Sequence, residues 1–160
     1  MAIVFAIIAL GLCVYISTLR HDSTLAEPRE ATEKTIEELR KLVFQWNDAH
    51  LSKDTGLFSD LFNGIVLFYG TQLDKNICIE KKISLFSKIP DFKQAIFGNI
   101  DVEKISDAEY RCNFMKRVTA DNNVTDYPSY LVFREINGDW KIVTESDLIT
   151  DKNLAKQRKK

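Results

Sequence analysis

Residues 45–54, QWNDAHLSKD, combine a tryptophan, a histidine and two aspartates at the end of a strongly periodic segment. An imidazole within reach of a carboxylate can act as a general acid or base. Trp46 and His50 are four residues apart, so on a helix they share one face. Two interpretations of His50 stay open: a ligand-contacting or catalytic residue, or a helix-end residue satisfied by backbone or water. Trp46 either contacts a ligand or packs in the core.

A second acidic candidate lies in TESD, near the end of the chain. On a strand, Glu145 and Asp147 point to the same face, where two carboxylates could share a proton or a metal ion. The alternative is a strand terminus or a sheet edge in solvent. With two histidines and no CxxC pattern, the chain is predicted to bind neither a metal nor a cofactor. Cys78 and Cys112 are expected to be separate buried thiols, with a disulfide as the alternative.

The predicted ligand-binding residues share aromatic or polar side chains that could line a pocket: Trp46, His50, Tyr69, Tyr130 and Glu145. No catalytic residue is predicted outright. His50 and Asp147 are the nearest candidates for that role.

Helices and strands must position these residues. Thr35 with Glu38 three residues later is typical of a capping box, and apolar residues then repeat at helical spacing as far as His50. Asp54 is placed to cap a second short helix, about 55–62. A strand at 65–69 follows, and then a helix over about 73–89 with Ile79, Ile83 and Phe86 on one face. The last elements are antiparallel strands over 92–105, 110–118, 127–136 and 140–145, the first of them broken near 98–99.

The first twenty residues suggest a membrane protein. Residues 2–19 carry no charge, and as a helix they would span about 27 Å, close to the hydrocarbon thickness of a bilayer. No basic region precedes them, which favours an uncleaved anchor over a cleaved signal peptide or a buried helix. Arg20, Arg29 and Lys34 follow the span, so the positive-inside rule favours a cytoplasmic domain, whereas short N-terminal anchors favour export. We expect a single-pass protein with an extracytoplasmic domain.

Charge and composition divide the chain further. Residues 151–160 carry a net charge of +4 and residues 1–150 carry −5, so the body is mildly acidic. An acidic body disfavours nucleic-acid binding. The predicted organisation is an anchor or uncleaved signal at 1–20, a linker at 21–34, one domain at 35–150, and a basic tail at 151–160. The tail is either a solvated terminus or a contact with a membrane surface or partner.

Several segments resemble one family. The pattern W…AH…KD…LFSDLF, the following VLFYG and the closing YPSYLVFREINGDWKIVTESD are similar to the nuclear transport factor 2-like superfamily over about residues 35–148. The resemblance implies an α+β fold, a cone-shaped, cystatin-like roll in which three N-terminal helices wrap a curved antiparallel sheet. Its interior can hold a small ligand. Members include ketosteroid isomerase, scytalone dehydratase, polyketide cyclases, transport factors and secretion-system scaffolds, so the fold alone does not give the function.

The ketosteroid isomerase pattern can be tested by position. When Asp54 and the LF pair are aligned, the general base of that enzyme falls at Gly70 and its oxyanion-binding tyrosine falls at Trp46. Its buried acid should lie within 130–133, where no acid stands. Because enolisation needs a carboxylate base and donors for the oxyanion, the resemblance does not extend to that reaction.

These observations predict a membrane-tethered, non-catalytic domain that binds a protein partner or a small apolar ligand through its curved sheet or cone mouth. The resemblance also implies a homodimer. The rival prediction is a lyase or isomerase that uses His50 with a carboxylate in the cone. A cavity of at least about 300 Å³, with His50 facing into it beside a carboxylate, would favour the enzyme, and a filled cone with His50 at the surface would exclude it.

Overall fold

The structure, a computed structural model, describes residues 32–159. Its helices are α2 (Glu33–Ser52), α3 (Thr55–Leu61), α4 (Lys75–Lys88) and α5 (Leu148–Gln157). Its strands are β1 (Phe62–Phe68), β2 (Thr71–Asp74), β3 (Lys93–Ser106), β4 (Glu109–Ala120), β5 (Asn123–Ile136) and β6 (Asp139–Asp147). The predicted anchor at 2–19 lies outside the described residues. Within 32–159, no helix is long and apolar enough to cross a membrane.

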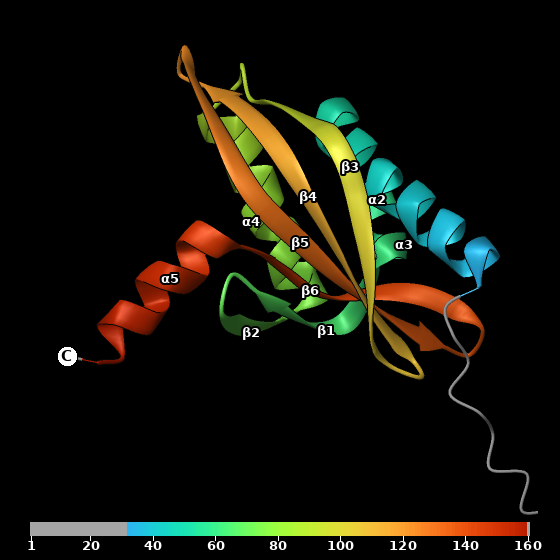
Figure 1. Cartoon of the computed structure of the whole chain (residues 1–160). Coiled ribbons are helices and arrows are strands. Elements are labelled where there is room, and N and C mark those ends of the chain that lie inside the picture. The colour runs from blue at the N-terminus through green and yellow to red at the C-terminus, as the bar shows by residue number, and fades with distance from the viewer. Residues whose placement is uncertain (1–31, 160) are drawn as a thin grey trace, which may run out of the picture.

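The strands form one curved sheet in the order β2-β1-β6-β5-β4-β3. All neighbours are antiparallel except β1 and β6, which are parallel. The long strands β3, β4 and β5 bend together, with α2 and α4 on the same side of the sheet (Figure 1). The predicted break near Gly98 is a register shift between Phe97 and Asp101 inside a continuous β3, where Gly98 adopts a φ of 73°. An L residue with a side chain rarely takes that conformation.

The core lies between the sheet and the helices. The largest fully buried side chains on the two sides include Leu39, Trp46 and Phe58 from the helices and Leu131, Phe133 and Ile142 from the strands. The inward stripe predicted for the first helix is confirmed, because Leu39, Val43, Trp46, Ala49 and His50 are all buried in α2. Apolar residues at this spacing remove one face of the helix from water.

The start of α2 differs from the prediction. The N-cap is Thr32, whose hydroxyl oxygen accepts a hydrogen bond from the Thr35 backbone N–H at 3.2 Å. Thr35 therefore lies in the first turn and does not cap the helix. A Ser or Thr oxygen satisfies an N–H group that has no acceptor within the helix, and both threonines fit that role by type. The predicted cap of the next helix is confirmed, since Asp54 accepts from the Leu57 N–H at 3.1 Å.

The inward face of α4 also differs from the prediction. The buried residues are Cys78, Lys82 and Phe86, whereas Ile83 is 47% exposed. The expected face containing Ile79 and Ile83 is therefore rotated by about one residue. The reason is an ion pair. The Lys82 ammonium pairs with the buried carboxylate of Glu145 on β6, so a lysine takes the place of an apolar residue on the inward face of α4.

Two further expectations about architecture are wrong. Only α2 and α3 precede the first strand; α4 follows β1 and β2, so the described chain does not have three N-terminal helices. Residues 148–157 are also helical, where the end of the domain and, from residue 151, a basic tail were expected. Asp147 caps this helix, α5, by accepting from the Thr150 backbone N–H at 2.7 Å. The helix projects from the body at the C-terminal end (Figure 1).

Cys78 and Cys112 are free and buried, as expected. Burial raises the pKa of the Cys78 thiol to about 11 and that of Cys112 to about 12. Both thiols therefore stay protonated at neutral pH, and a protonated thiol is a poor nucleophile. They act as small core residues.

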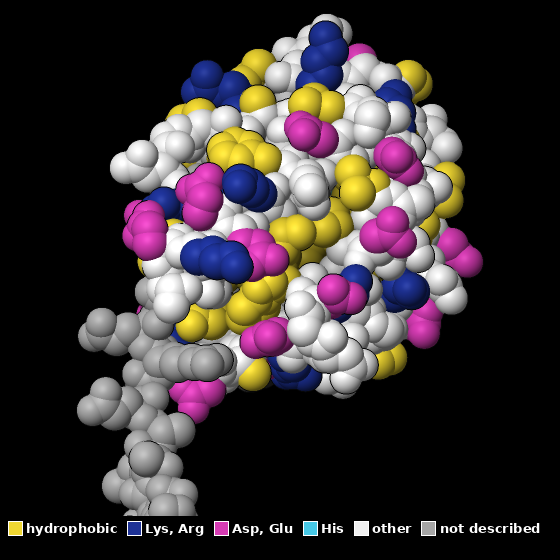
Figure 2. Space-filling model, turned by 90° about the vertical axis from the view of Figure 1, so that its right-hand side faces the viewer, with side chains coloured by type: hydrophobic (Ala, Val, Ile, Leu, Met, Phe, Trp, Pro, Cys, Tyr) yellow, Lys and Arg dark blue, Asp and Glu magenta, His cyan; other side chains and the backbone are white. Residues whose placement is uncertain are grey.

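Charges of both signs are interspersed on the face shown in Figure 2, and hydrophobic side chains gather in a strip between them. This view looks from the right-hand side of Figure 1, where α2 and β3 lie. The exposed apolar residues of the strands include Ile65, Leu67 and Ile105.

Candidate functional site

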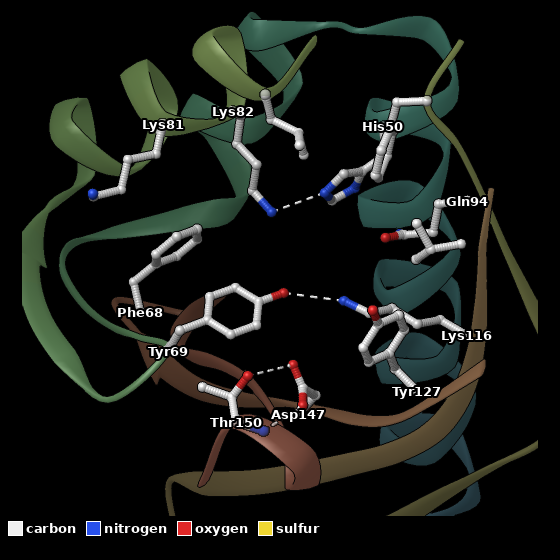
Figure 3. A pocket seen from close by; sticks show the side chains of 13 residues that line it. His50, Phe68, Tyr69, Lys81, Lys82, Gln94, Lys116, Tyr127, Asp147 and Thr150 are labelled. Carbon is white, nitrogen blue, oxygen red and sulfur yellow. Dashed lines mark hydrogen bonds between the residues drawn. The ribbon is translucent and has the colours of Figure 1, made fainter. Parts of the chain in front are cut away.

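A cavity of about 380 Å³, open to solvent on one side, lies between the sheet and the helices α2 and α4. Aromatic rings and aliphatic side chains supply part of its wall, and a few polar groups converge on it (Figure 3). This size and lining are usual for a site that takes a small organic molecule. The lining residues are His50, Phe68, Tyr69, Lys81, Lys82, Leu85, Phe92, Gln94, Lys116, Val118, Tyr127, Asp147 and Thr150.

The last turn of α2 brings His50 to the cavity. Its ring packs edge-on against Trp46, with centroids 4.5 Å apart, and against Phe58 at 4.7 Å. Nδ1 lies 2.8 Å from the Trp46 carbonyl oxygen, which can only accept, so Nδ1 carries the proton. Nε2 then accepts from the Lys82 ammonium at 2.8 Å. Burial, followed by the charge of Lys82, holds the pKa of His50 well below its usual range, so the ring is neutral at neutral pH.

Glu145 joins the two helices to the sheet. Its side chain is 1% exposed, and it ion-pairs with Lys82 of α4. Its second oxygen accepts from the Trp46 indole N–H of α2 at 2.9 Å. A buried carboxylate needs such partners because it has lost its water. Glu145 thus fixes the relative positions of α2, α4 and β6, and its oxygens are occupied by protein donors.

Lys82 completes this buried network. Its ammonium contacts Glu145 and His50 and also lies 5.3 Å from the Phe58 ring centroid. Burial lowers the pKa of Lys82, and the neighbouring Glu145 carboxylate opposes that effect. Within residues 32–159, no buried side-chain nitrogen or oxygen lacks a hydrogen-bond partner. Trp46, His50, Lys82 and Glu145 therefore form a closed cluster, here called the paired network.

On the opposite wall, Lys116 of β4 lies beside Tyr69. The ammonium donates to the Tyr69 hydroxyl oxygen at 3.0 Å, and the two side chains point toward each other across the cavity floor (Figure 3). Burial lowers the pKa of Lys116 to about 8, with the Glu145 carboxylate opposing and the Lys82 ammonium adding to that shift. Burial, followed by the Glu145 carboxylate, raises the pKa of Tyr69 well above its usual range, so the hydroxyl keeps its proton.

Two other polar groups at the cavity are used within the protein. The Asp147 carboxylate accepts from the Thr150 backbone N–H at 2.7 Å and from the Thr150 hydroxyl at 3.0 Å. The Gln94 amide donates to the Asn47 side-chain oxygen at 3.4 Å, so it makes only a weak contact on that side. Among the described residues, no cluster of His, Cys, Asp or Glu could hold a metal ion.

The predicted site residues fall into three groups. His50, Tyr69 and Asp147 line the cavity. Trp46 and Glu145 are buried behind it and hold the paired network together. Tyr130 lies elsewhere: it alternates with buried Leu131 in β5, and its hydroxyl donates to Asp151 of α5 at 2.9 Å.

The shared face of Glu145 and Asp147 is confirmed in part. Both side chains are buried, at 1% and 4% exposed, on one side of β6. Each carboxylate already has a partner within the protein, because Glu145 pairs with Lys82 and Asp147 caps α5.

The two buried lysines are the residues that sequence reasoning missed. Lys116 follows Cys112 and Phe114 at alternating positions of β4, so the period of two points it inward. Lys82 follows Cys78 at a spacing of four in α4. Both signals were present, but a lysine at such a position is normally taken as surface.

Comparison with known proteins gives structural likeness only. No family model and no curated protein matches the sequence. A domain with a cystatin-like fold from Nostoc punctiforme superposes with a TM-score of 0.62 at 15% identity, covering 81% of this chain and 88% of that one. An NTF2-like protein from Pseudomonas putida gives 0.58 at 12% identity, covering 69% and 83%. These likenesses show a cystatin-like, NTF2-like fold.

A third similar structure is Bd1075 of Bdellovibrio bacteriovorus, with a TM-score of 0.61 and 16% identity over 72% of this chain. This chain spans 40% of the length of that protein. At such identities the likeness establishes the nuclear transport factor 2-like fold and leaves the chemistry to be argued from the cavity. The predicted cone-shaped, cystatin-like roll is therefore supported at the level of fold, while its ligand is not.

Proposed function

We propose that this protein is a non-catalytic binding domain that holds a small molecule in the cavity between the sheet, α2 and α4. The observation that carries the proposal is a cavity of about 380 Å³ in which Phe68, Phe92 and Tyr127 supply apolar surface beside polar and charged side chains. Apolar walls supply affinity by removing ligand surface from water, and sparse polar groups fix its orientation.

The rival proposal, a lyase or isomerase, gains support from the cavity and from His50 at its wall. The position of Lys82 counts against it. The lone pair of His50 Nε2 already accepts from the Lys82 ammonium, and Lys82 separates the ring from Glu145. A general base needs a free lone pair directed at the substrate proton. The geometry therefore supports binding better than acid–base catalysis.

Blocking the cavity tests the proposal. Val118 of β4 lines the cavity and is half-buried, so Val118→Phe should fill part of it. The matched control is Val124→Phe, at a position that is 61% exposed. The full chain in lipid nanodiscs would be screened by protein-observed NMR against small aromatic compounds, both charged and neutral.

We expect compounds that shift resonances of cavity residues in the wild type and in Val124→Phe, and loss of these shifts in Val118→Phe. The proposal fails if no compound binds at the cavity, or if those that bind do so equally well to Val118→Phe. Turnover of a bound compound that disappears in His50→Gln would instead establish the enzyme.

The membrane tether is a second part of the proposal, supported by the uncharged residues 2–19. Sodium carbonate extraction of cell membranes checks it: an inserted anchor keeps the protein in the pellet, and a chain released to the supernatant contradicts the tether. The protein partner and the homodimer stay predictions, with exposed apolar strand residues such as Ile65 and Leu67 as the surface on which they depend.

A further inference from the structure

Lys116 has fewer partners than its burial demands. The residue is 6% exposed, and its ammonium makes one hydrogen bond within the described residues, to the Tyr69 hydroxyl oxygen at 3.0 Å. No described carboxylate oxygen lies within ion-pair distance of it. An ammonium has three N–H donors. Two donors therefore lack a protein acceptor at a nitrogen that borders the cavity.

The nearest surroundings of Lys116 are aromatic. The ammonium lies 5.6 Å from the Trp46 ring centroid, 5.6 Å from that of Tyr69 and 5.9 Å from that of Tyr127. Ring faces attract a cation, but each contact is worth only about 0.5–2 kcal/mol and supplies no hydrogen-bond acceptor. Such rings also offer a flat surface on which a planar ligand can pack. The surroundings of the Lys116 ammonium thus suit a ligand with a planar apolar body that carries an anionic hydrogen-bond acceptor.

The neighbouring charges favour a single negative charge on that ligand. Lys82 and Glu145 neutralise each other, and the Asp147 carboxylate is directed to Thr150. With Lys81 and Lys116 also at the wall, the three lysines and two carboxylates leave a net charge of about +1, which a monoanion balances and a dianion such as a phosphate monoester exceeds. Among the described residues, no arginine lines the cavity, so none of them offers the bidentate fork that suits phosphate.

We infer that Lys116 is the anchor for the carboxylate of a small planar monoacid, which occupies the cavity with its apolar body against Phe68, Phe92 and Tyr127. This inference rests on the proposed function. It names the class of ligand and the residue that selects it. The Tyr69 hydroxyl, held by Lys116, is the neutral group beside the bound carboxylate.

The protonation state of Lys116 supports this role. With a pKa lowered by burial to about 8, most of the side chain is still an ammonium at pH 7. The charged and titratable groups that face it are Tyr69, Tyr127, Glu145, Asp147, Lys82 and His50. A bound carboxylate favours the ammonium, so ligand binding raises the pKa of Lys116. Affinity for the acid must therefore fall about tenfold per pH unit above pH 8, until the bound form also titrates.

Two probes of the same shape test the inference: 2-naphthoate, which is a monoanion, and 2-naphthamide, which is neutral. Both would be titrated by calorimetry into the full chain in lipid nanodiscs, with empty nanodiscs subtracted. The variant is Lys116→Met, which keeps the length and apolar stem of the side chain. The control is Lys93→Met, an exposed lysine at the start of β3. A third probe, 2-naphthyl phosphate, distinguishes a monoanion site from a phosphate site.

We expect the wild type and Lys93→Met to bind naphthoate about tenfold or more tighter than naphthamide, as for a hydrogen bond to a charged group. Lys116→Met should lose that preference and bind naphthamide as the wild type does. Naphthyl phosphate should bind less tightly than naphthoate. In the wild type, naphthoate affinity should fall above pH 8 while naphthamide affinity stays constant.

The inference is overturned if the wild type binds both probes equally, if Lys116→Met keeps the preference for the acid, or if the phosphate binds as tightly as the acid. These outcomes leave the proposed function standing, because the cavity still holds a molecule. Failure of all three probes to bind the wild type contradicts the proposed function and this inference together. The wild-type pH profile decides the matter even if Lys116→Met does not fold.

Discussion

Two lysines of the same depth differ in what surrounds them. Lys82 is 4% exposed and Lys116 is 6% exposed, and both border one cavity. Lys82 meets the Glu145 carboxylate and the His50 lone pair, whereas Lys116 meets one neutral hydroxyl and the faces of aromatic rings. Burial alone therefore does not define a lysine's role. The Lys82 ammonium has its hydrogen-bond acceptors within the protein, whereas the Lys116 ammonium has N–H donors left for a ligand.

The difference has an energetic consequence. Removing a charge from water costs several kcal/mol, and a close counter-ion and hydrogen bonds offset that cost. For Lys82, Glu145 supplies the offset and also accepts from the Trp46 indole. For Lys116 the offset is incomplete, and its lowered pKa of about 8 expresses this. A binding site commonly keeps such unsatisfied polarity where a ligand will supply the missing partner.

The largest effect is expected on the paired network. Glu145→Gln leaves the Lys82 ammonium buried without a counter-ion, which should lower the free energy of unfolding by about 3–5 kcal/mol. Urea denaturation measures this loss. The control is Glu103→Gln on β3, an exposed residue, which should change stability by less than about 0.5 kcal/mol. Equal stability of Glu145→Gln and the wild type would show that the pair contributes little.

The two lysine substitutions should change the free energy of unfolding in opposite directions, and by less than Glu145→Gln does. Lys82→Met should destabilise the protein at pH 7 because it leaves Glu145 unpaired, while Lys116→Met should be at least as stable as the wild type. The pH dependence of the free energy of unfolding shows in which direction Lys116 changes stability. The pKa of Lys116 in the folded protein, about 8, lies below that of an unfolded lysine, so the folded state releases its proton first.

It follows that the wild type gains stability relative to Lys116→Met as pH rises from about 8 to about 10.4, by up to about 3 kcal/mol. Taking the difference between the two proteins removes the contributions of the cysteines, which titrate in the same range. Urea denaturation at pH 7, 8, 9 and 10 measures it. A constant difference would mean that Lys116 titrates normally.

The smallest effect is expected on the surface, one residue away from Lys116. Arg117 pairs with Asp126 across β4 and β5 at 2.7 Å, but both side chains are exposed. Solvent and salt screen such a pair, so Asp126→Asn should leave the urea midpoint unchanged at 150 mM salt. A clear loss of stability would contradict the view that burial separates the important ion pair from the unimportant one.

Much of this fold was predictable from local patterns. Helical spacing of Leu39, Val43 and Trp46 gave α2 and its inward face, and Asp54 marked the start of α3. Alternation of apolar and polar residues predicted β4 to β6, and the family resemblance predicted the cone-shaped fold. The short strand β2 and helix α5 lack a strong period, because each is held by contacts with the rest of the chain: Leu154 of α5, for instance, packs against Gly70.

The site was predicted less completely. His50, Tyr69 and Asp147 were named and do line the cavity. The lysines were not named, since pattern alone counts lysine as polar and places it outside. Their burial depends on partners distant in sequence: Lys82 on Glu145, 63 positions later, and Lys116 on Tyr69, 47 positions earlier. Such pairing follows from the tertiary fold, which the periodicity of a single segment does not encode.

The most direct test of the contrast between the two lysines is NMR titration of the full chain carrying ¹³C-labelled lysine, followed through the Cε shifts with and without 2-naphthoate. Resonances are assigned with Lys82→Met and Lys116→Met. We expect Lys116 to titrate near pH 8 in the free protein and at higher pH with naphthoate bound, while the titration of Lys82 is unchanged. A free-protein pKa near the usual 10.4 for Lys116, or a naphthoate-induced shift at Lys82 in its place, would contradict the account.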